Sequence, residues 1–134
     1  MSRGAAFGDV DILVTNNNGP ARLLLNEIGS HTHWLQVRLE GAKGNRNGIG
    51  AKVAVIRKNL KPLWRRVHAD GSYLSASDAR AHFGLGLESN LEAVVVQWPG
   101  GGQEIWVNVR ANTLITLRQN TGKPWSANVK KGDE

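Results

Sequence analysis

Cysteine is absent from this chain of 134 residues, which excludes disulfide bonds, thiolate nucleophiles, Cys-ligated zinc sites and iron–sulfur clusters. The absence leaves the compartment open, because chains without thiols occur in every compartment. No apolar run approaches the ~20 residues of a membrane-spanning helix. Residues 1–7 lack the ~7–15-residue apolar stretch of a signal peptide. Proline is scarce, with four residues against 16 glycines, and this ratio indicates a folded domain with many turns.

Acidic side chains are in the minority. Asp and Glu number 11 against 17 Lys and Arg, which gives a formal net charge of +6. The excess is concentrated in residues 31–70, where nine basic side chains accompany two acidic ones. A localised basic band can attract nucleic acid, anionic lipid or an acidic glycan. The alternative is a solvated sheet face rich in Lys and Arg, which is common in folded proteins.

A helical apolar periodicity is missing over any stretch of ~10 or more residues, so helix is minor. Short alternating stretches are present instead, at residues 34–40, 51–57 and 63–69, and residues 93–98 form the continuous apolar run of a central strand. These patterns predict an all-β fold, either an antiparallel β-sandwich or a partly open barrel of short strands. The expected core consists of Leu35, Val37, Val53, Val55, Val67, Phe83, Val94, Val96, Ile105 and Leu117.

Four segments carry further expectations. Residues 51–68 are predicted to form a β-hairpin with one solvated face. Residues 70–90 are expected to form a long loop with its own apolar anchors, and residues 21–26 a buried strand. Residues 120–134 are a polar tail, predicted to be disordered and to fray unless Trp125 docks.

Three motifs in order carry a resemblance to a known family. They are Gly-Asn-Arg-Asn-Gly-Ile-Gly-Ala at residues 44–51, His-Phe-Gly-Leu-Gly at 82–86 and Val-Gln-Trp-Pro-Gly-Gly at 96–101. Together they resemble the ASPIC/UnbV domain, which occurs at the end of proteins with FG-GAP (VCBS) repeats, such as the cartilage acidic protein group. The resemblance runs from about Trp34 to Leu117, so residues 31–119 are expected to be the domain. It implies a non-catalytic interaction module in a secreted or extracytoplasmic protein.

Upstream, residues 4–16 resemble the closing strand of an FG-GAP repeat. In such a repeat, alternating Asp and Asn residues followed by Gly and a further Asp supply a calcium loop. Here Asp9 and Asp11 lead directly into Ile12, and two carboxylates cannot supply the ~6–8 oxygens that calcium requires. Residues 1–30 are therefore interpreted as a truncated repeat end, a strand plus an Asn-rich turn, without a calcium site.

The glycine-rich loop is one candidate binding element. Glycine permits a left-handed backbone in Asn47-Gly48-Ile49-Gly50, and consecutive amides there could form an anion nest beside Arg46. A purely structural turn is the alternative. Trp98 either packs over its turn or stacks on a sugar ring.

Catalytic and metal sites have little support in the sequence. His31 and His33 have the spacing of two ligands on one strand face, but a third ligand is not evident. His82 lacks an identifiable catalytic partner, and the nearby Ser72, Ser75, Ser77 and Asp78 include no nucleophile elbow and are suited to loop hydrogen bonds. We therefore expect no enzyme, no catalytic residue, no metal and no cofactor.

Two function classes stay open. The first is an interaction module that binds protein or carbohydrate through a sheet face and the glycine-rich loops. The second is a module for nucleic acid or another polyanion, which uses residues 52–66 and stacks its ligand on Trp64. The cations expected to bind a polyanion are Lys52, Lys58, Lys61 and Arg66, with Arg57 and Arg65 on the same segment. The oligomeric state is not indicated by the sequence.

Overall fold

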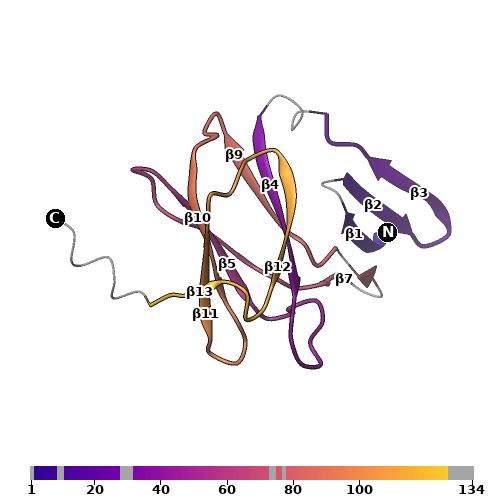
Figure 1. The fold of residues 1–134 in the computed structure, drawn as a ribbon. Coiled ribbons are helices and arrows are strands. Elements are labelled where there is room, and N and C mark those ends of the chain that lie inside the picture. Colours follow the sequence, from indigo (N-terminus) through magenta and orange to yellow (C-terminus); the bar gives the residue numbers. More distant parts are fainter. Residues whose placement is uncertain (1, 9–10, 28–31, 73–74, 77, 127–134) are drawn as a thin grey trace.

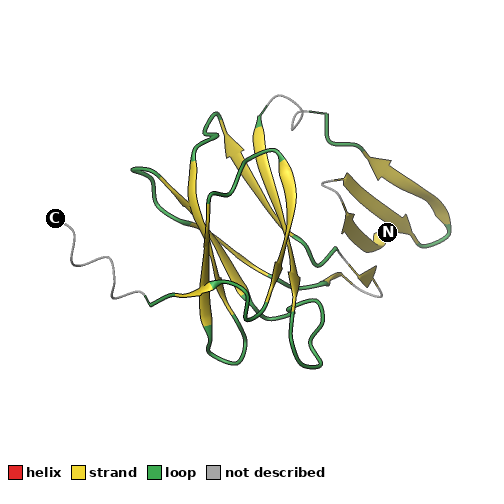
Figure 2. Ribbon diagram, viewed as in Figure 1, coloured by secondary structure: helices red, strands yellow, loops and turns green. Residues whose placement is uncertain are grey.

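A computed structural model describes the protein at residues 2–8, 11–27, 32–72, 75–76 and 78–126. Over these ranges the chain forms strands joined by loops and turns, with no helix (Figure 2). The predicted all-β class is therefore confirmed. Since the described ranges contain no helix, they also contain none that is long and apolar enough to cross a membrane.

A small antiparallel sheet occupies the N-terminal part of the chain, with strand order β1-β2-β3. Its strands are β1 (Ser2–Gly8), β2 (Asp11–Asn16) and β3 (Gly19–Leu24). β1 and β2 thus stand where one closing strand was expected over residues 4–16. The strand expected at residues 21–26 corresponds to β3, which is solvent-exposed along its whole length rather than buried. Asn18, at φ 63°, makes the tight turn between β2 and β3. The sheet lies beside the larger domain in Figure 1, where β1 contacts the short strands β7 and β8.

The larger domain is a sandwich of two main sheets (Figure 1). One has the strand order β13-β11-β10-β5-β6 and the other β12-β4-β9, while β7 and β8 pair with each other. The strands are β4 (His33–Glu40), β5 (Lys52–Arg57), β6 (Leu63–Arg66), β7 (Asp70–Ser72), β8 (Ser75–Ala76), β9 (Ala81–Gly86), β10 (Leu91–Gln97), β11 (Gln103–Val107), β12 (Thr113–Arg118) and β13 (Lys123–Pro124).

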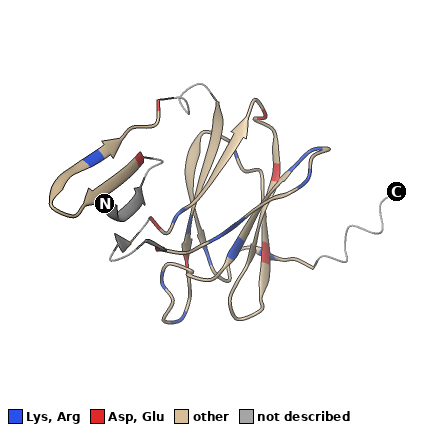
Figure 3. Ribbon diagram, turned by 180° about the vertical axis from the view of Figure 1, so that it is seen from behind, with Lys and Arg blue, Asp and Glu red and all other residues tan. Residues whose placement is uncertain are grey.

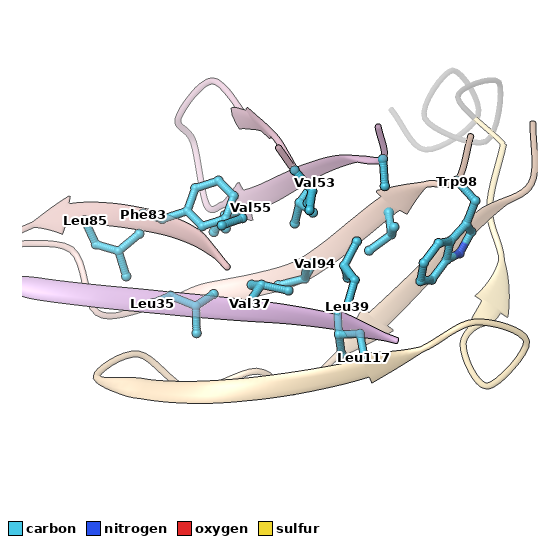
Figure 4. Close-up of a cluster of buried hydrophobic side chains, with 14 residues drawn as sticks. Leu35, Val37, Leu39, Val53, Val55, Phe83, Leu85, Val94, Trp98 and Leu117 are labelled. Carbon is cyan, nitrogen blue, oxygen red and sulfur yellow. The ribbon is translucent and has the colours of Figure 1, made fainter. Parts of the chain in front are cut away.

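The main core lies between these two sheets (Figure 4). Strand alternation sends Leu35, Val37 and Leu39 of β4 to one side, where they meet Val53 and Val55 of β5. Nine of the ten predicted core residues are buried here: Leu35, Val37, Val53, Val55, Val67, Phe83, Val94, Val96 and Leu117. Ile105 is the exception, because its side chain is only partly buried and belongs to a second cluster.

The second cluster lies on the opposite face of the five-stranded sheet. Ala54, Ile56 and Val95 are buried there, and Ile105 and Trp125 pack against them. The expectation of a solvated face on the 51–68 hairpin is therefore wrong for most of β5, although the hairpin itself forms. Trp125 also donates its backbone N–H to the Gln103 carbonyl at 3.0 Å.

Two segments differ from their predicted form. Residues 81–86, placed in a long loop by the sequence, are strand β9, which pairs with β4 so that Phe83 lies opposite Leu35. Residues 120–126 of the polar tail, predicted to fray unless Trp125 docks, include β13, which pairs with β11, and Trp125 does pack on the sheet. The rest of that tail, residues 127–134, lies outside the described residues.

One pairing in the sandwich is parallel. β12 runs alongside β4 in a register that joins Thr113 to Leu35 at one end and Arg118 to Glu40 at the other. The Asn112 N–H donates to the Trp34 carbonyl at 2.6 Å, and Arg118 Nε donates to a Glu40 carboxylate oxygen at 2.6 Å. All other described strand pairs are antiparallel, so the fold is a mostly antiparallel sandwich.

Candidate ligand-binding surface

The β5–β6 hairpin brings the predicted basic residues to one edge of the five-stranded sheet. Its turn reverses at Asn59, which has φ 58°, and Arg57 Nη2 braces it by donating to the Lys61 carbonyl at 3.0 Å. Lys52 then lies directly opposite Arg66 in the strand register. In the ribbon of Figure 3, blue segments of Lys and Arg mark the tip of this hairpin.

Lys52 and Arg66 form an uncompensated pair of like charges. Residues opposite each other on antiparallel strands share a face, with Cβ atoms ~4.5–5.5 Å apart, and like charges in such positions destabilise the sheet. Ion pairs elsewhere join Arg80 to Asp78 and Arg118 to Glu40, and His68 Nδ1 lies 3.3 Å from a carboxylate oxygen of Asp70. Within the described ranges, neither Lys52 nor Arg66 has an acidic partner, so this pair favours an anionic ligand.

A hollow of about 460 Å³ opens over the same pair of cations. It is lined by Lys52, Trp64, Arg65, Arg66 and Gln97. Alternation puts Trp64 on the same face as Lys52 and Arg66, and its side chain is 41% exposed. The hollow therefore combines an accessible aromatic ring with cations and an amide.

Arg65 differs from its neighbour Arg66 in direction. Its guanidinium carbon lies 5.8 Å from the centroid of the Phe83 ring, which belongs to the main core. Its Nη1 donates to the Trp64 carbonyl at 2.9 Å. These contacts fix Arg65 at the rim, on the core side of the strand.

The remaining two predicted cations are not part of the hollow. Lys58 and Lys61 are exposed at the hairpin turn and are absent from its lining. Gln97 belongs to the lining but was not among the predicted site residues. Its signal in the sequence is the single polar interruption of the apolar run in β10, and the register then places it opposite Lys52.

The glycine-rich loop is a structural turn rather than an anion nest. The Gly48 amide donates to the Asn45 carbonyl at 3.1 Å, and the Ile49 amide donates to Asn45 Oδ1 at 2.9 Å. The Gly50 amide donates to the Val67 carbonyl at 2.8 Å. Because these three donors are used inside the protein, the nest expected at Arg46, Asn47, Gly48 and Gly50 lacks the amides of both glycines.

Close packing explains why this turn needs glycine. Gly48 has φ 62°, and a Cβ atom added there would lie 2.8 Å from the Leu39 Cβ. The ring of Trp98 lies on the same side, 3.4 Å from that position. The turn therefore packs closely against Leu39, at the C-terminal end of β4.

Trp98 is a core residue and not a stacking surface. Only 4% of its surface is exposed. Its indole N–H donates to Glu104 Oε2 at 2.6 Å, in the buried interior. Of the two tryptophans proposed to stack on a ligand, the exposed one is Trp64.

His33, His82 and Asp78 each have a structural contact. His33 Nδ1 lies 2.8 Å from Asn112 Nδ2, and the ring of His82 stacks on Trp34 at 6.4 Å between centroids. Asp78 forms an ion pair with Arg80. No group of three or more His, Cys, Asp or Glu side chains suited to a metal occurs among the residues that the structure describes. His31 and Ser77 lie outside those residues, and the side chains of Ser72 and Ser75 are not described.

Comparison with known protein families gives one match. A family model described as ASPIC and UnbV matches residues 41–124, a range that includes the whole β5–β6 hairpin and Gln97. The three motifs that suggested the resemblance all fall inside the match. No curated protein matches the chain.

Proposed function

Because the chain belongs to the ASPIC and UnbV family, we propose that it is a non-catalytic interaction module that binds a protein or carbohydrate through its β5–β6 edge. The observation that carries this proposal is the direct opposition of Lys52 and Arg66 beside the exposed Trp64. An acidic partner would remove the repulsion between the two cations. The glycine-rich loops carry less of this proposal, because the amides of Gly48, Ile49 and Gly50 are used internally.

We also propose that the protein is secreted or extracytoplasmic, as the family resemblance implies. Residues 1–30 are then the truncated end of an FG-GAP-type repeat, joined to the family domain. The sheet β1-β2-β3 is compatible with such an end, since it is separate from the two sheets of the sandwich.

Binding to an acidic partner is expected to be weak and sensitive to salt. Exposed ion pairs contribute only ~0–1 kcal/mol each, and ions at physiological strength screen them over about 8 Å. Replacing any one of Lys52, Lys58, Lys61 or Arg66 by Ala should therefore have little effect. Replacing all four should abolish the interaction.

The test is retention on a heparin column at low and high salt. We expect the wild type to be retained at low salt and the fourfold variant Lys52→Gln, Lys58→Gln, Lys61→Gln and Arg66→Gln to pass through. A control with the same charge loss elsewhere, Arg22→Gln, Lys43→Gln, Arg110→Gln and Lys123→Gln, changes exposed side chains and should keep most of the retention. Equal elution of the wild type and the hairpin variant would show that the basic band is only a solvated face.

A second candidate is a module for nucleic acid that uses residues 52–66. The same Trp64 favours it, because exposed aromatic rings beside cations stack on bases. Such a module would bind oligonucleotides with a steep salt dependence and would prefer them to heparin at equal charge. The first proposal requires no bases.

A further inference from the structure

We propose that the hollow between β10, β5 and β6 is a subsite for one anionic sugar residue of an acidic glycan, a uronate or a sulfated pyranose. This inference rests on the proposed function and names the ligand class of that surface. In the bound state Trp64 stacks on the apolar face of the sugar ring. Lys52 and Arg66 bind its carboxylate or sulfate, and Gln97 hydrogen-bonds its hydroxyl groups.

Trp64 is the tryptophan best placed for stacking. It is exposed, whereas Trp98 is buried and Trp34, Trp106 and Trp125 are half-buried. Its strand is paired along Leu63–Arg66 with β5, which in turn pairs with β10. A ring on a strand anchored in this way loses little conformational freedom on binding. Covering its exposed surface with the carbon face of a pyranose removes apolar area from water.

The charge of the lining fits one anionic group. Lys52 supplies a compact ammonium, and Arg66 supplies a planar guanidinium that can bind two oxygens of one carboxylate or sulfate. Their opposition across the two strands places both cations over the same point of the sheet. The lining contains no carboxylate, so an anion meets no repulsion there.

Gln97 gives the hollow a neutral polar wall. Its amide both donates and accepts hydrogen bonds, as sugar hydroxyl groups also do. The register places it opposite Lys52, on the side away from Arg66. The volume of about 460 Å³ lies in the range of ligand sites of about 300–1,000 Å³.

The same lining is less suited to a nucleic-acid strand. Proteins that bind single strands stack successive bases on several aromatic side chains along a basic groove. Trp64 is the one aromatic residue in this lining. Lys58 and Lys61 lie at the hairpin tip, where no aromatic residue continues the path.

The experiment is titration of the full chain with a heparin tetrasaccharide, followed by calorimetry and tryptophan fluorescence. Trp64→Leu removes the ring and Trp64→Phe retains one. Lys52→Gln with Arg66→Gln removes the two charges of the hollow. The matched control, Lys58→Gln with Lys61→Gln, removes two charges from the same hairpin outside it. An uncharged tetrasaccharide, inorganic polyphosphate and oligothymidylate serve as competitors.

We expect saturable binding by the wild type, and a loss of roughly tenfold with Trp64→Leu, as for removal of one stacked ring. Trp64→Phe should keep most of the affinity, and its fluorescence change on binding should disappear. The Lys52 and Arg66 double variant should bind the tetrasaccharide much more weakly than the Lys58 and Lys61 double variant, because only the first pair lines the hollow. The uncharged sugar should not compete.

Three results would overturn the subsite. One is equal binding by wild type and Trp64→Leu when both melt at the same temperature. Another is equal loss in the two double variants. The third is competition by oligothymidylate that depends on Trp64 and exceeds that of the tetrasaccharide, which would assign the surface to nucleic acid. The first of these results, together with normal retention of the wild type on heparin, would leave the proposed function standing and refute only the sugar subsite. Failure of the wild type to be retained on heparin would refute both the proposed function and the sugar subsite.

Discussion

Glu104 is a buried carboxylate that joins three parts of the chain. It accepts hydrogen bonds from the Trp98 indole at 2.6 Å, from the Asn120 amide at 3.0 Å and from the Gly122 amide at 2.9 Å. With 8% of its surface exposed, water cannot replace these donors. The carboxylate therefore fastens the turn after β12 to the end of β10.

Replacement of Glu104 by Gln tests this role. The amide NH₂ group would meet a donor where the carboxylate accepted one, so we expect a loss of about 1–3 kcal/mol in the free energy of unfolding. Urea unfolding measures it. Glu92→Gln, the same change at an exposed position of β10, should have little effect. An equal loss in the two variants would mean that the three hydrogen bonds contribute nothing specific.

Gly48 is constrained by both backbone and packing, and Gly84 by neither. An Ala at position 48 would need φ near 62° and a Cβ atom 2.8 Å from Leu39, so we expect Gly48→Ala to cost at least about 1 kcal/mol. At Gly84 no atom lies within 4 Å of the added Cβ. Gly84→Ala should therefore be close to neutral in thermal melting, and similar melting temperatures for the two variants would contradict the packing argument.

Trp125, which follows the edge strand β13, packs on the outer face of the five-stranded sheet. Trp125 packs against Ala54, Ile56 and Val95 of the second cluster. We expect Trp125→Ala to lower the unfolding free energy by about 1–3 kcal/mol through lost apolar burial, without changing heparin retention. Trp64→Ala should weaken heparin retention and leave the free energy of unfolding unchanged, because its side chain is exposed at the hairpin edge. Unfolding curves and column retention of both variants decide the matter.

Alternation made the strands and much of the candidate surface predictable. It placed Val53 and Val55 inside and put Lys52 on the face of Arg66, all of which the register confirms. Alternation does not give strand partners, so neither Gln97 opposite Lys52 nor the parallel pairing of β12 was predictable. In β9, Gly84 and Gly86 occupy the outward positions where polar residues would reveal the alternation of a strand. The sequence therefore predicts a loop there instead of a strand.

The burial of β5 on both faces was missed for a related reason. Ala54 and Ile56 are apolar, but they share their face with Lys52, and this charge gave the face a polar appearance. Trp125, which covers that face, lies far away in sequence in a segment with few apolar residues. Local patterns predicted a hairpin correctly and could not reveal a distant cover.

At the scale of the whole molecule, we expect calcium neither to bind tightly nor to stabilise the chain. Asp11 Oδ1 accepts the Asn26 amide at 2.9 Å, which ties the start of β2 to the end of the sheet. A ligand at 100 times its dissociation constant would add ~2.7 kcal/mol. The melting temperature should therefore be the same in millimolar calcium and in chelator, and a clear rise with calcium would refute this expectation.

The parallel pairing of β12 with β4 has a kinetic consequence. Its partners run from Thr113 with Leu35 to Arg118 with Glu40. In the sequence, most of the other strands of the sandwich lie between β4 and β12. Closing so long a loop costs entropy before any contact compensates it, and folds dominated by distant pairings form slowly. During synthesis, β4 emerges first and its free edge waits for residues 113–118 to leave the ribosome. Until then that edge can pair with other extended chains, so aggregation competes with folding most strongly in this interval.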